Sequence, residues 1–347
     1  PLERAGVRRD EATIFSIIIP ARNEEQNILN CFASIYKQTY PSTGFEVIVV
    51  DDHSTDKTAV LVAAQKHSNL KLIRLSADQT GKKQAITEGI KNASGDFIIT
   101  TDADCEMGPE WLSSIILFYQ EKRPKMVVGP VLIKGESSFQ ETMQAQEMTV
   151  LSACAAGSIY YNLPILCSGA NLSFEKSAFT KVNGFDGVEQ TATGDDMFLM
   201  LKIHSEFPGS IAYLKSKEAI VFTHPEKLAS DALKQRKRWA SKTFSYPKRG
   251  ASSQRRHGLS HVTWVAILIF FTNFLILFSG IISIINIKFV LVPAVCFSSK
   301  FIVDLMLLYS ASSFFGKKMN PFVFAAASVM YPVYVSGMGL ILSLIHI

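Results

Sequence analysis

The segment VIVVDDH (residues 47–53) joins a run of β-branched apolar residues to two adjacent carboxylates. A second segment, FIITTDAD (residues 97–104), also joins an apolar run to two carboxylates, here one residue apart. Short apolar runs of this kind are typical of buried strands, and ligands bind open α/β sheets at the carboxyl ends of the strands. The carboxylates of both segments are therefore predicted to lie where strands end, in a ligand-binding crevice.

Strand-like and helix-like stretches alternate along the first hundred residues. Strands are expected at 14–19, 46–50, 70–75 and 96–100, and helices at 24–36, 55–66 and 83–93, with Ser54 or Thr55 capping the second helix. This alternation predicts a mostly parallel sheet wound by right-handed crossovers. A dinucleotide-binding Rossmann domain fits less well, because the first turn, PARNEE (residues 20–25), has no glycine that would let a pyrophosphate approach the backbone.

Three apolar segments follow, at 262–285, 289–310 and 321–345. Each is near the length of about 20 residues that crosses a bilayer. A basic stretch at 234–256 directly precedes them, and the positive-inside rule places such a stretch in the cytoplasm. We therefore expect an integral membrane protein, of a bacterial inner membrane, whose soluble part is cytoplasmic. Nucleic acid is not an expected partner, because the basic residues cluster beside a membrane segment and not around aromatic platforms.

The acidic and basic motifs occur in a fixed order. Asp51-Asp52 comes first, then Asp102-Ala103-Asp104, then Asp195-Asp196, and finally QRKRW (residues 235–239) before the apolar segments. This series resembles the D, DxD, (E/D)D, QxxRW pattern of the membrane-bound inverting glycosyltransferases of family 2, which include cellulose, hyaluronan and poly-N-acetylglucosamine synthases and ceramide glucosyltransferase-like enzymes. The resemblance covers about residues 16–239 and the apolar tail.

The resemblance implies an α/β, GT-A nucleotide-sugar-binding domain with a Rossmann-like, mostly parallel sheet, followed by an amphipathic interface helix and transmembrane helices. The corresponding boundaries are 14–225 for the catalytic domain, 226–260 for the basic interface segment and 261–347 for three transmembrane helices. Residues 1–13 are expected to be a polar lead-in of a truncated chain.

Residues after the first strand are implied to line the uracil and ribose of a UDP-sugar: Pro20, Ala21 and Glu24. An aspartate at the end of the second strand is implied to face the base, because the uracil N3–H donates and a carboxylate only accepts. Asp51 and Asp52 are both candidates, with a slight preference for Asp52. The alternative for Asp52 is a cap on the helix that begins near residue 56.

Lys82 opens a predicted helix within the segment GKKQ (residues 81–84). A cation is unfavourable at a helix N-terminus, so we expect Lys82 to bind a diphosphate, with a solvated surface lysine as the alternative. Two carboxylates one residue apart can reach one hard cation, and the resemblance implies that Asp102 and Asp104 hold Mg²⁺ or Mn²⁺ against the diphosphate leaving group. A turn with solvated aspartates is the alternative.

The resemblance implies that Asp196 is the general base and that Asp195 supports it or contacts the acceptor, with exchanged roles as the alternative. The positive end of a following helix keeps such carboxylates ionised. Gly169 and Asn171 resemble an acceptor-side loop, although an ordinary turn explains them too. Gln235, Arg238 and Trp239 are implied to contact the acceptor and the diphosphate, and an interfacial anchor is the alternative.

The resemblance therefore implies metal-dependent, inverting transfer from a nucleotide-diphospho-sugar to a lipid-linked or membrane-surface glycan acceptor. A processive polysaccharide synthase and a catalytically silent nucleotide-sugar-binding scaffold are the alternatives. Within the second apolar segment Lys300 and Asp304 stand four residues apart, a spacing that predicts an ion pair.

Overall fold

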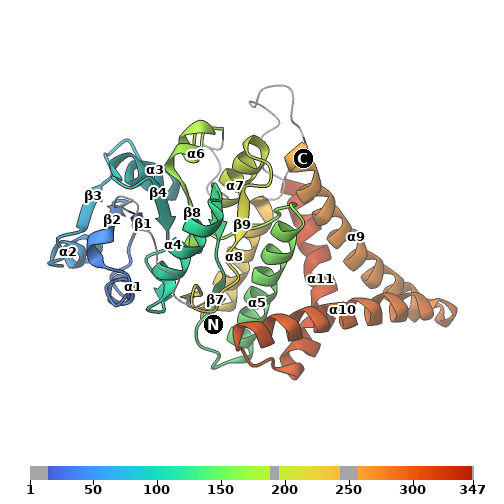
Figure 1. Ribbon diagram of the computed structural model, residues 1–347. Helices are drawn as coiled ribbons and strands as arrows, with labels where there is room; N and C mark the ends of the chain where they lie inside the picture. The colour runs from blue at the N-terminus through green and yellow to red at the C-terminus, as the bar shows by residue number, and fades with distance from the viewer. Residues whose placement is uncertain (1–14, 188–194, 243–256, 346–347) are drawn as a thin grey trace. The chain divides into compact units, whose positions relative to one another are not determined.

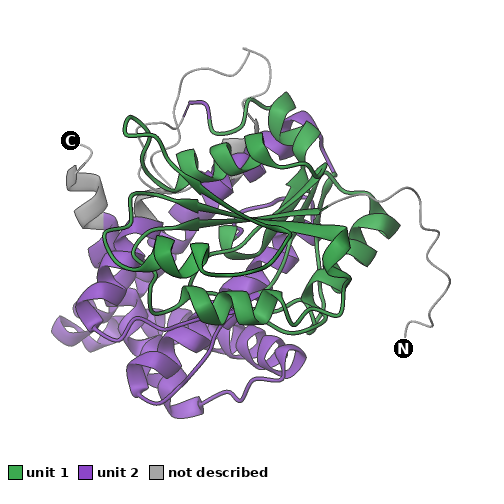
Figure 2. Ribbon diagram, turned by 90° about the vertical axis from the view of Figure 1, so that its left-hand side faces the viewer, with its two compact units in different colours: residues 1–130, 168–185, 210–221 green, residues 131–167, 186–209, 222–347 purple. Residues whose placement is uncertain are grey.

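The structure is a computed structural model that describes residues 15–187, 195–242 and 257–345 (Figure 1). The predicted lead-in at 1–13 and the part of the interface segment at 243–256 lie outside the described residues. The chain forms two compact units that interleave along the sequence (Figure 2). Unit 1 comprises residues up to 130, 168–185 and 210–221, and unit 2 comprises 131–167, 186–209 and the residues from 222 onwards.

Unit 1 is built on a seven-stranded sheet with the order β3-β2-β1-β4-β8-β6-β9. Strands β3, β2, β1 and β4 run parallel, β8 runs antiparallel to both β4 and β6, and β6 and β9 are parallel. The prediction of an α/β fold with a mostly parallel sheet is therefore confirmed. The strands are β1 (Phe15–Ala21), β2 (Phe45–Asp51), β3 (Leu70–Arg74), β4 (Phe97–Thr100), β6 (Met126–Val128), β8 (Leu172–Glu175) and β9 (Ile211–Tyr213).

Helices cover both faces of this sheet (Figure 2). They are α1 (Ile28–Ile35), α2 (Thr58–Ala63), α3 (Lys82–Asn92), α4 (Trp111–Lys122) and α6 (Lys176–Lys181). Helix α3 approaches closely, because a Cβ on Gly89 would lie 2.6 Å from the side chain of Ile18 on β1. The apolar runs of β1 and β2 are buried almost throughout, as strands covered on both faces should be.

The cap of α2 differs from the expectation. Ser54 and Thr55 do not cap this helix, which begins only at Thr58. The Oδ1 atom of Asp56 accepts the backbone N–H of Thr58 at 2.9 Å, and the Ser54 hydroxyl instead accepts the N–H of Asn23 at 3.0 Å. Ser54 therefore does not act as a helix cap, because its hydroxyl binds Asn23, which is distant in the sequence.

Unit 2 is mostly helical. Its helices are α5 (Phe139–Tyr160), α7 (Asp195–Glu206), α8 (Ala229–Lys242), α9 (His257–Ile285), α10 (Leu291–Phe315) and α11 (Pro321–Ile345). The short strands are β5 (Glu106–Met107) in unit 1, β7 (Val131–Ile133) in unit 2, and β10 (Val221–Thr223), which lies at the sequence boundary between the two units.

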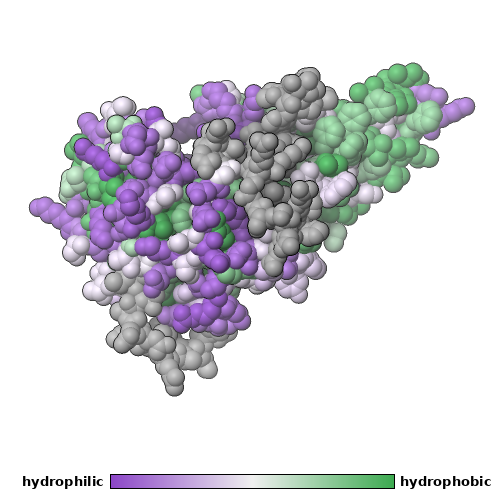
Figure 3. All heavy atoms as spheres, turned by 90° about the horizontal axis from the view of Figure 1, so that it is seen from above, coloured by the Kyte–Doolittle hydropathy of each residue, from purple (hydrophilic) through white to green (hydrophobic). Residues whose placement is uncertain are grey.

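Among the residues that the structure describes, three helical segments are long and apolar enough to cross a membrane, namely Val262–Ile285, Ile287–Phe315 and Pro321–Gly339. Their apolar surface is visible at the right of Figure 3. The predicted ion pair between Lys300 and Asp304 is confirmed, and the Lys300 ammonium also lies 4.8 Å from the ring centroid of Tyr331. Ionisable groups inside a span are costly unless paired. The ion pair lies within α10, and the ring contact joins α10 to α11.

Candidate active site

The loop after β4 carries the two aspartates of the DxD motif. Ala103, Cys105 and Met107 are buried, whereas Asp102 and Asp104 are half-buried. The loop is closed by a hydrogen bond from the N–H of Cys105 to the carbonyl of Asp102 at 3.1 Å. Buried and half-buried side chains alternate along this loop. The side chains of Ala103, Cys105 and Met107 therefore anchor the loop in the core, and the carboxylates of Asp102 and Asp104 face the same side.

Lys82 and Glu24 lie beside these aspartates. The Lys82 ammonium is 2.5 Å from Oδ1 of Asp102, so the start of α3 and the loop after β4 meet. Burial raises the pKa of Glu24, and the nearby carboxylates of Asp104 and Asp102 also raise it. A hydrogen bond from Asn27 lowers this pKa but does not cancel the rise. The predicted donor residues of three separate loops are therefore brought together in unit 1.

These groups fit a hard divalent cation. Carboxylate oxygens are the ligands that Mg²⁺ and Mn²⁺ prefer, and burial raises the pKa of the neighbouring Cys105 thiol well above its usual range, which keeps it out of a thiolate role. Over the residues that the structure describes, no three acidic, histidine or cysteine side chains form a ready cage. Mg²⁺ commonly uses one or two carboxylates together with substrate phosphates and water, so Asp102 and Asp104 suit a cation shared with a diphosphate.

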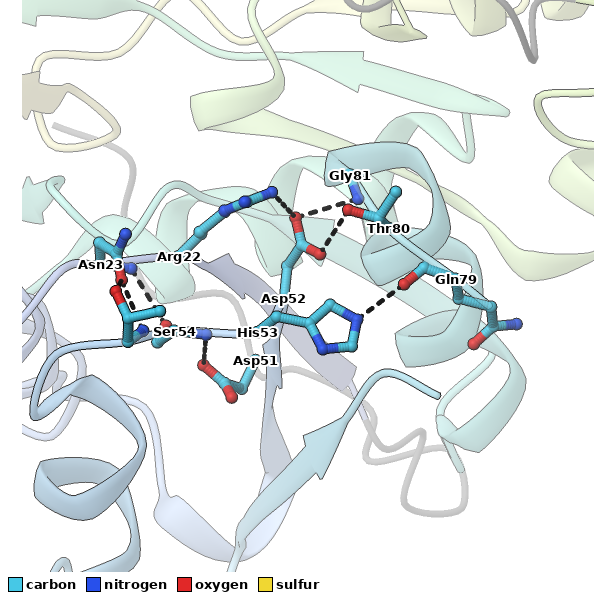
Figure 4. Close-up of polar contacts among 10 residues, drawn as sticks. Arg22, Asn23, Asp51, Asp52, His53, Ser54, Gln79, Thr80 and Gly81 are labelled. Carbon is cyan, nitrogen blue, oxygen red and sulfur yellow. Dashed lines mark hydrogen bonds and ion pairs between the residues drawn. The ribbon is translucent and has the colours of Figure 1, made fainter. Parts of the chain in front are cut away.

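Asp51 and Asp52 point in different directions (Figure 4). Asp52 is buried, and its carboxylate accepts the N–H of Gly81 at 2.9 Å and the hydroxyl of Thr80 at 3.2 Å, with Arg22 Nη1 at 3.4 Å. It does not cap α2. Asp51 lines a hollow together with Arg74, its register partner on β3.

The first turn holds the other predicted donor residues. Pro20 and Ala21 are the last residues of β1, and the Ala21 carbonyl accepts the N–H of Asp52 at 2.9 Å. Glu24 follows in the turn, where its N–H donates to the hydroxyl of Thr58 at 2.7 Å. The turn is thus tied to the end of β2 and to the start of α2.

Asp195 and Asp196 open helix α7 in unit 2, as the sequence predicts for this pair. Asp195 is 8% exposed, and Asp196 is half-buried. The Oδ1 atom of Asp196 accepts the N–H of Met197 at 2.9 Å. Both carboxylates therefore sit at the positive end of the helix dipole, where a negative charge is favourable.

Gly169 and Asn171 form a buried 3₁₀ turn before β8. The Asn171 side chain donates to the carbonyls of Pro130 and Ala219, both at 2.8 Å, and accepts the indole N–H of Trp111 at 3.1 Å. Asn171 is 1% exposed, and both of its amide hydrogens are engaged. These contacts correct the acceptor-loop prediction for Asn171, because its amide binds the protein itself.

The QxxRW segment lies on α8. Gln235 and Trp239 line a small cavity together with Arg236, whereas Arg238 is exposed. Arg236 forms an ion pair with Glu147 of α5, including an Nε–Oε2 hydrogen bond of 3.0 Å. Its side chain is only 11% exposed. Motif reading missed Arg236 and Glu147, because Arg236 occupies a variable position of the motif and Glu147 lies 89 residues away.

Comparison with known proteins identifies the family. The model of glycosyl transferase family 2 matches residues 16–181, which include both aspartate motifs of unit 1. Residues 16–181 are a glycosyl transferase family 2 domain. The chain is similar to poly(ribitol-phosphate) beta-N-acetylglucosaminyltransferase TarS of Staphylococcus aureus, with 29% identity over 198 residues, covering 55% of this chain but only 32% of TarS.

A second relative matches more of this chain. The poly-beta-1,6-N-acetyl-D-glucosamine synthase of Staphylococcus epidermidis is 26% identical over 294 residues, covering 79% of this chain and 68% of the relative. Among solved structures, the mannosyltransferase PcManGT from Pyrobaculum calidifontis, in complex with GDP-Man and Mn²⁺, has a TM-score of 0.59 at 18% identity and covers 94% of this chain and 86% of its own. This likeness confirms the GT-A fold.

Proposed function

We propose that this family 2 chain is an inverting, metal-dependent glycosyltransferase that moves a hexosyl or N-acetylhexosaminyl group from a UDP-sugar to a lipid-linked or membrane-surface glycan acceptor. The observation that carries the proposal is the meeting of Lys82 with the DxD aspartates, 2.5 Å from Asp102, where strands of a parallel sheet end. One ammonium and two carboxylates at such an edge suit a metal-bound diphosphate.

The groups beside the β2–β3 edge favour uracil. Asp51 only accepts hydrogen bonds and Arg74 only donates them, and both line the same hollow. The edge of uracil presents one N–H between two carbonyl oxygens, so a carboxylate and a guanidinium complement it together. Transfer of an N-acetylhexosaminyl group is supported by the similarity to TarS, which is named for N-acetylglucosaminyl transfer.

Transfer is proposed to be a single displacement at the anomeric carbon. The acceptor hydroxyl oxygen forms the new bond to C1, its proton passes to the Asp196 carboxylate, and the C1–O bond to the β-phosphate breaks with its electron pair going to the phosphate oxygen. Configuration at C1 therefore inverts. Lys82 neutralises part of the charge that develops on the diphosphate. A cation bound by Asp102 and Asp104 supplies Lewis-acid stabilisation of the same group.

The acceptor is proposed to arrive at the bilayer surface, with the catalytic part in the cytoplasm. Trp239 lies on α8, the last described helix before the first candidate span. A half-buried indole can stack on a sugar ring through its exposed part, because aromatic faces suit the apolar faces of sugars. Single addition to a lipid-linked acceptor is proposed over processive synthesis.

Release of nucleoside diphosphate from a panel of UDP-, GDP- and dTDP-sugars, by membranes that contain the full chain, tests the proposal. UDP release that depends on Asp104 and on added lipid extract is the expected result. Binding of donors without release would favour the silent scaffold, and a ladder of products in mass spectrometry would favour the processive synthase. Release from GDP-sugars alone would refute the assignment of a uridine donor.

A further inference from the structure

Helix α3 begins in an unusual way. Lys82 and Lys83 occupy its first turn, where the helix dipole disfavours cations. The preceding residue, Gly81, has a φ of +93° and no side chain to cap the helix. A Cβ on Gly81 would meet nothing within 4 Å, so the backbone angle and not a lack of space requires glycine. The stabilising groups for this helix start must come from elsewhere in the fold.

Asp52 supplies them from the end of β2. One carboxylate oxygen accepts the Gly81 N–H at 2.9 Å, and the other accepts the Thr80 hydroxyl at 3.2 Å. Asp52 is 5% exposed, and a buried carboxylate is stable only when its oxygens are hydrogen-bonded. An acidic group beside a helix N-terminus also offsets the two lysines.

His53 holds the same segment one residue earlier. Its Nε2 lies 2.8 Å from the carbonyl oxygen of Gln79, and because a carbonyl only accepts, Nε2 carries the hydrogen. The ring can reach this carbonyl because His53 has a φ of +55°. Residues 79–81 are thus fixed at three consecutive positions by two neighbours at the end of β2 (Figure 4).

The body of α3 cannot move to compensate. Gly89 brings the helix against Ile18 and Val50 of the sheet, where an added Cβ would lie 2.6 Å from Ile18. With the helix axis set by this packing, the path of residues 79–81 determines where Lys82 begins and whether its ammonium reaches the DxD loop. That ammonium lies 2.5 Å from Asp102 Oδ1.

We propose that Asp52 and His53 are positioning residues that hold residues 79–81 so that Lys82 faces the diphosphate of the donor. This inference rests on the proposed function, since it assumes a nucleoside diphosphate bound at Lys82. The proposal gives Asp52 a role that acts through Lys82, whereas its neighbour Asp51 is the residue proposed to contact the nucleobase.

Comparison of UDP with uridine tests the role of Asp52. Competition against a fluorescent UDP probe on the full chain in detergent measures both affinities for wild type, Asp52→Ala, Lys82→Ala and the double variant. Loss of a hydrogen bond to a charged group is worth about 1.5–3 kcal/mol, so UDP affinity should fall roughly tenfold to a hundredfold in each single variant. Uridine affinity should stay unchanged, because uridine has no diphosphate.

The double variant should bind UDP no more weakly than Lys82→Ala, because Asp52 acts through that lysine. Additive losses, or an equal loss of uridine and UDP affinity in Asp52→Ala, would overturn the proposal and make Asp52 a direct contact to the base. If wild type binds neither UDP nor uridine, the proposed donor itself is wrong. If UDP binds but uridine affinity depends on Asp52, only the positioning role is wrong.

Two further variants decide the matter if Asp52→Ala does not fold. His53→Asn keeps a residue that tolerates positive φ but cannot reach Gln79, and Thr80→Val removes one hydroxyl. Each variant should lower UDP affinity severalfold while uridine affinity stays unchanged. Unchanged UDP affinity in both variants would refute the positioning role of Asp52 and His53. Glu121→Gln, an exposed change on α4, is the matched control for loss of one negative charge.

Discussion

Asn171→Ala should destabilise unit 1 strongly. The substitution removes three hydrogen bonds at a site that is 1% exposed. It leaves the Trp111 indole N–H and the Ala219 carbonyl without this partner, whereas the Pro130 carbonyl still accepts the N–H of Val221 at 3.1 Å. At about 1.5 kcal/mol for each of the two buried groups left unsatisfied, the loss is about 3 kcal/mol. A domain of this size loses about 2–4 °C in Tm per kcal/mol, so Tm should fall by about 6–12 °C.

Thermal unfolding of the full chain in detergent, followed by tryptophan fluorescence and circular dichroism, measures this shift. Trp111→Phe is the matched control, because it removes only the 3.1 Å bond to Asn171 and keeps an aromatic ring in the core. Its Tm should fall by less than that of Asn171→Ala. If Asn171→Ala keeps its Tm within about 2 °C of wild type but abolishes transfer to the acceptor, the assignment of a structural role is refuted.

Four further outcomes are expected. Asp104→Ala, or excess chelator on wild type, should abolish UDP release, and full transfer in chelator would contradict the metal dependence. Asp196→Asn should keep donor affinity while lowering transfer at least about a hundredfold, and undiminished transfer would assign the base elsewhere. Trp239→Ala should reduce transfer far more than donor hydrolysis, and equal losses would argue against acceptor stacking. Burial raises the pKa of Glu46, but the Lys71 ammonium and serine hydroxyls outweigh it and lower that pKa from 4.5 to about 2. The stability that Glu46 contributes is then present above about pH 4.5 and lost as pH falls towards 2, so acid unfolding of Glu46→Gln should show a shallower slope in this window.

The local pattern of apolar residues was sufficient to predict the first four strands and the first three helices. Strands β1 to β4 and helices α1 to α3 lie within a few residues of their predicted positions, because a parallel strand covered on both faces must be a continuous apolar run. The candidate spans likewise follow from length and apolarity, and the Lys300–Asp304 pair follows from one turn of helix. Each of these features depends on residues close together in the chain.

The roles of single side chains in the site needed the tertiary structure. Asp51 and Asp52 look equivalent in the sequence, but only the tertiary structure shows that Asp52 accepts the N–H of Gly81 at 2.9 Å whereas Asp51 accepts the N–H of Ser54 at 3.3 Å. The predicted roles of Asp196 and Trp239 stay predictions.

Distant contacts explain the remaining differences. Asn171 is joined to Trp111 across 60 residues and to Pro130 across 41 residues, and Arg236 is joined to Glu147 across 89 residues. A motif records which side chains are present, but these hydrogen bonds depend on which strands and helices become neighbours. The sequence alone therefore determined the first strands and helices, the candidate spans and the resemblance to a family, and the tertiary structure decided which partners the polar side chains have within the protein.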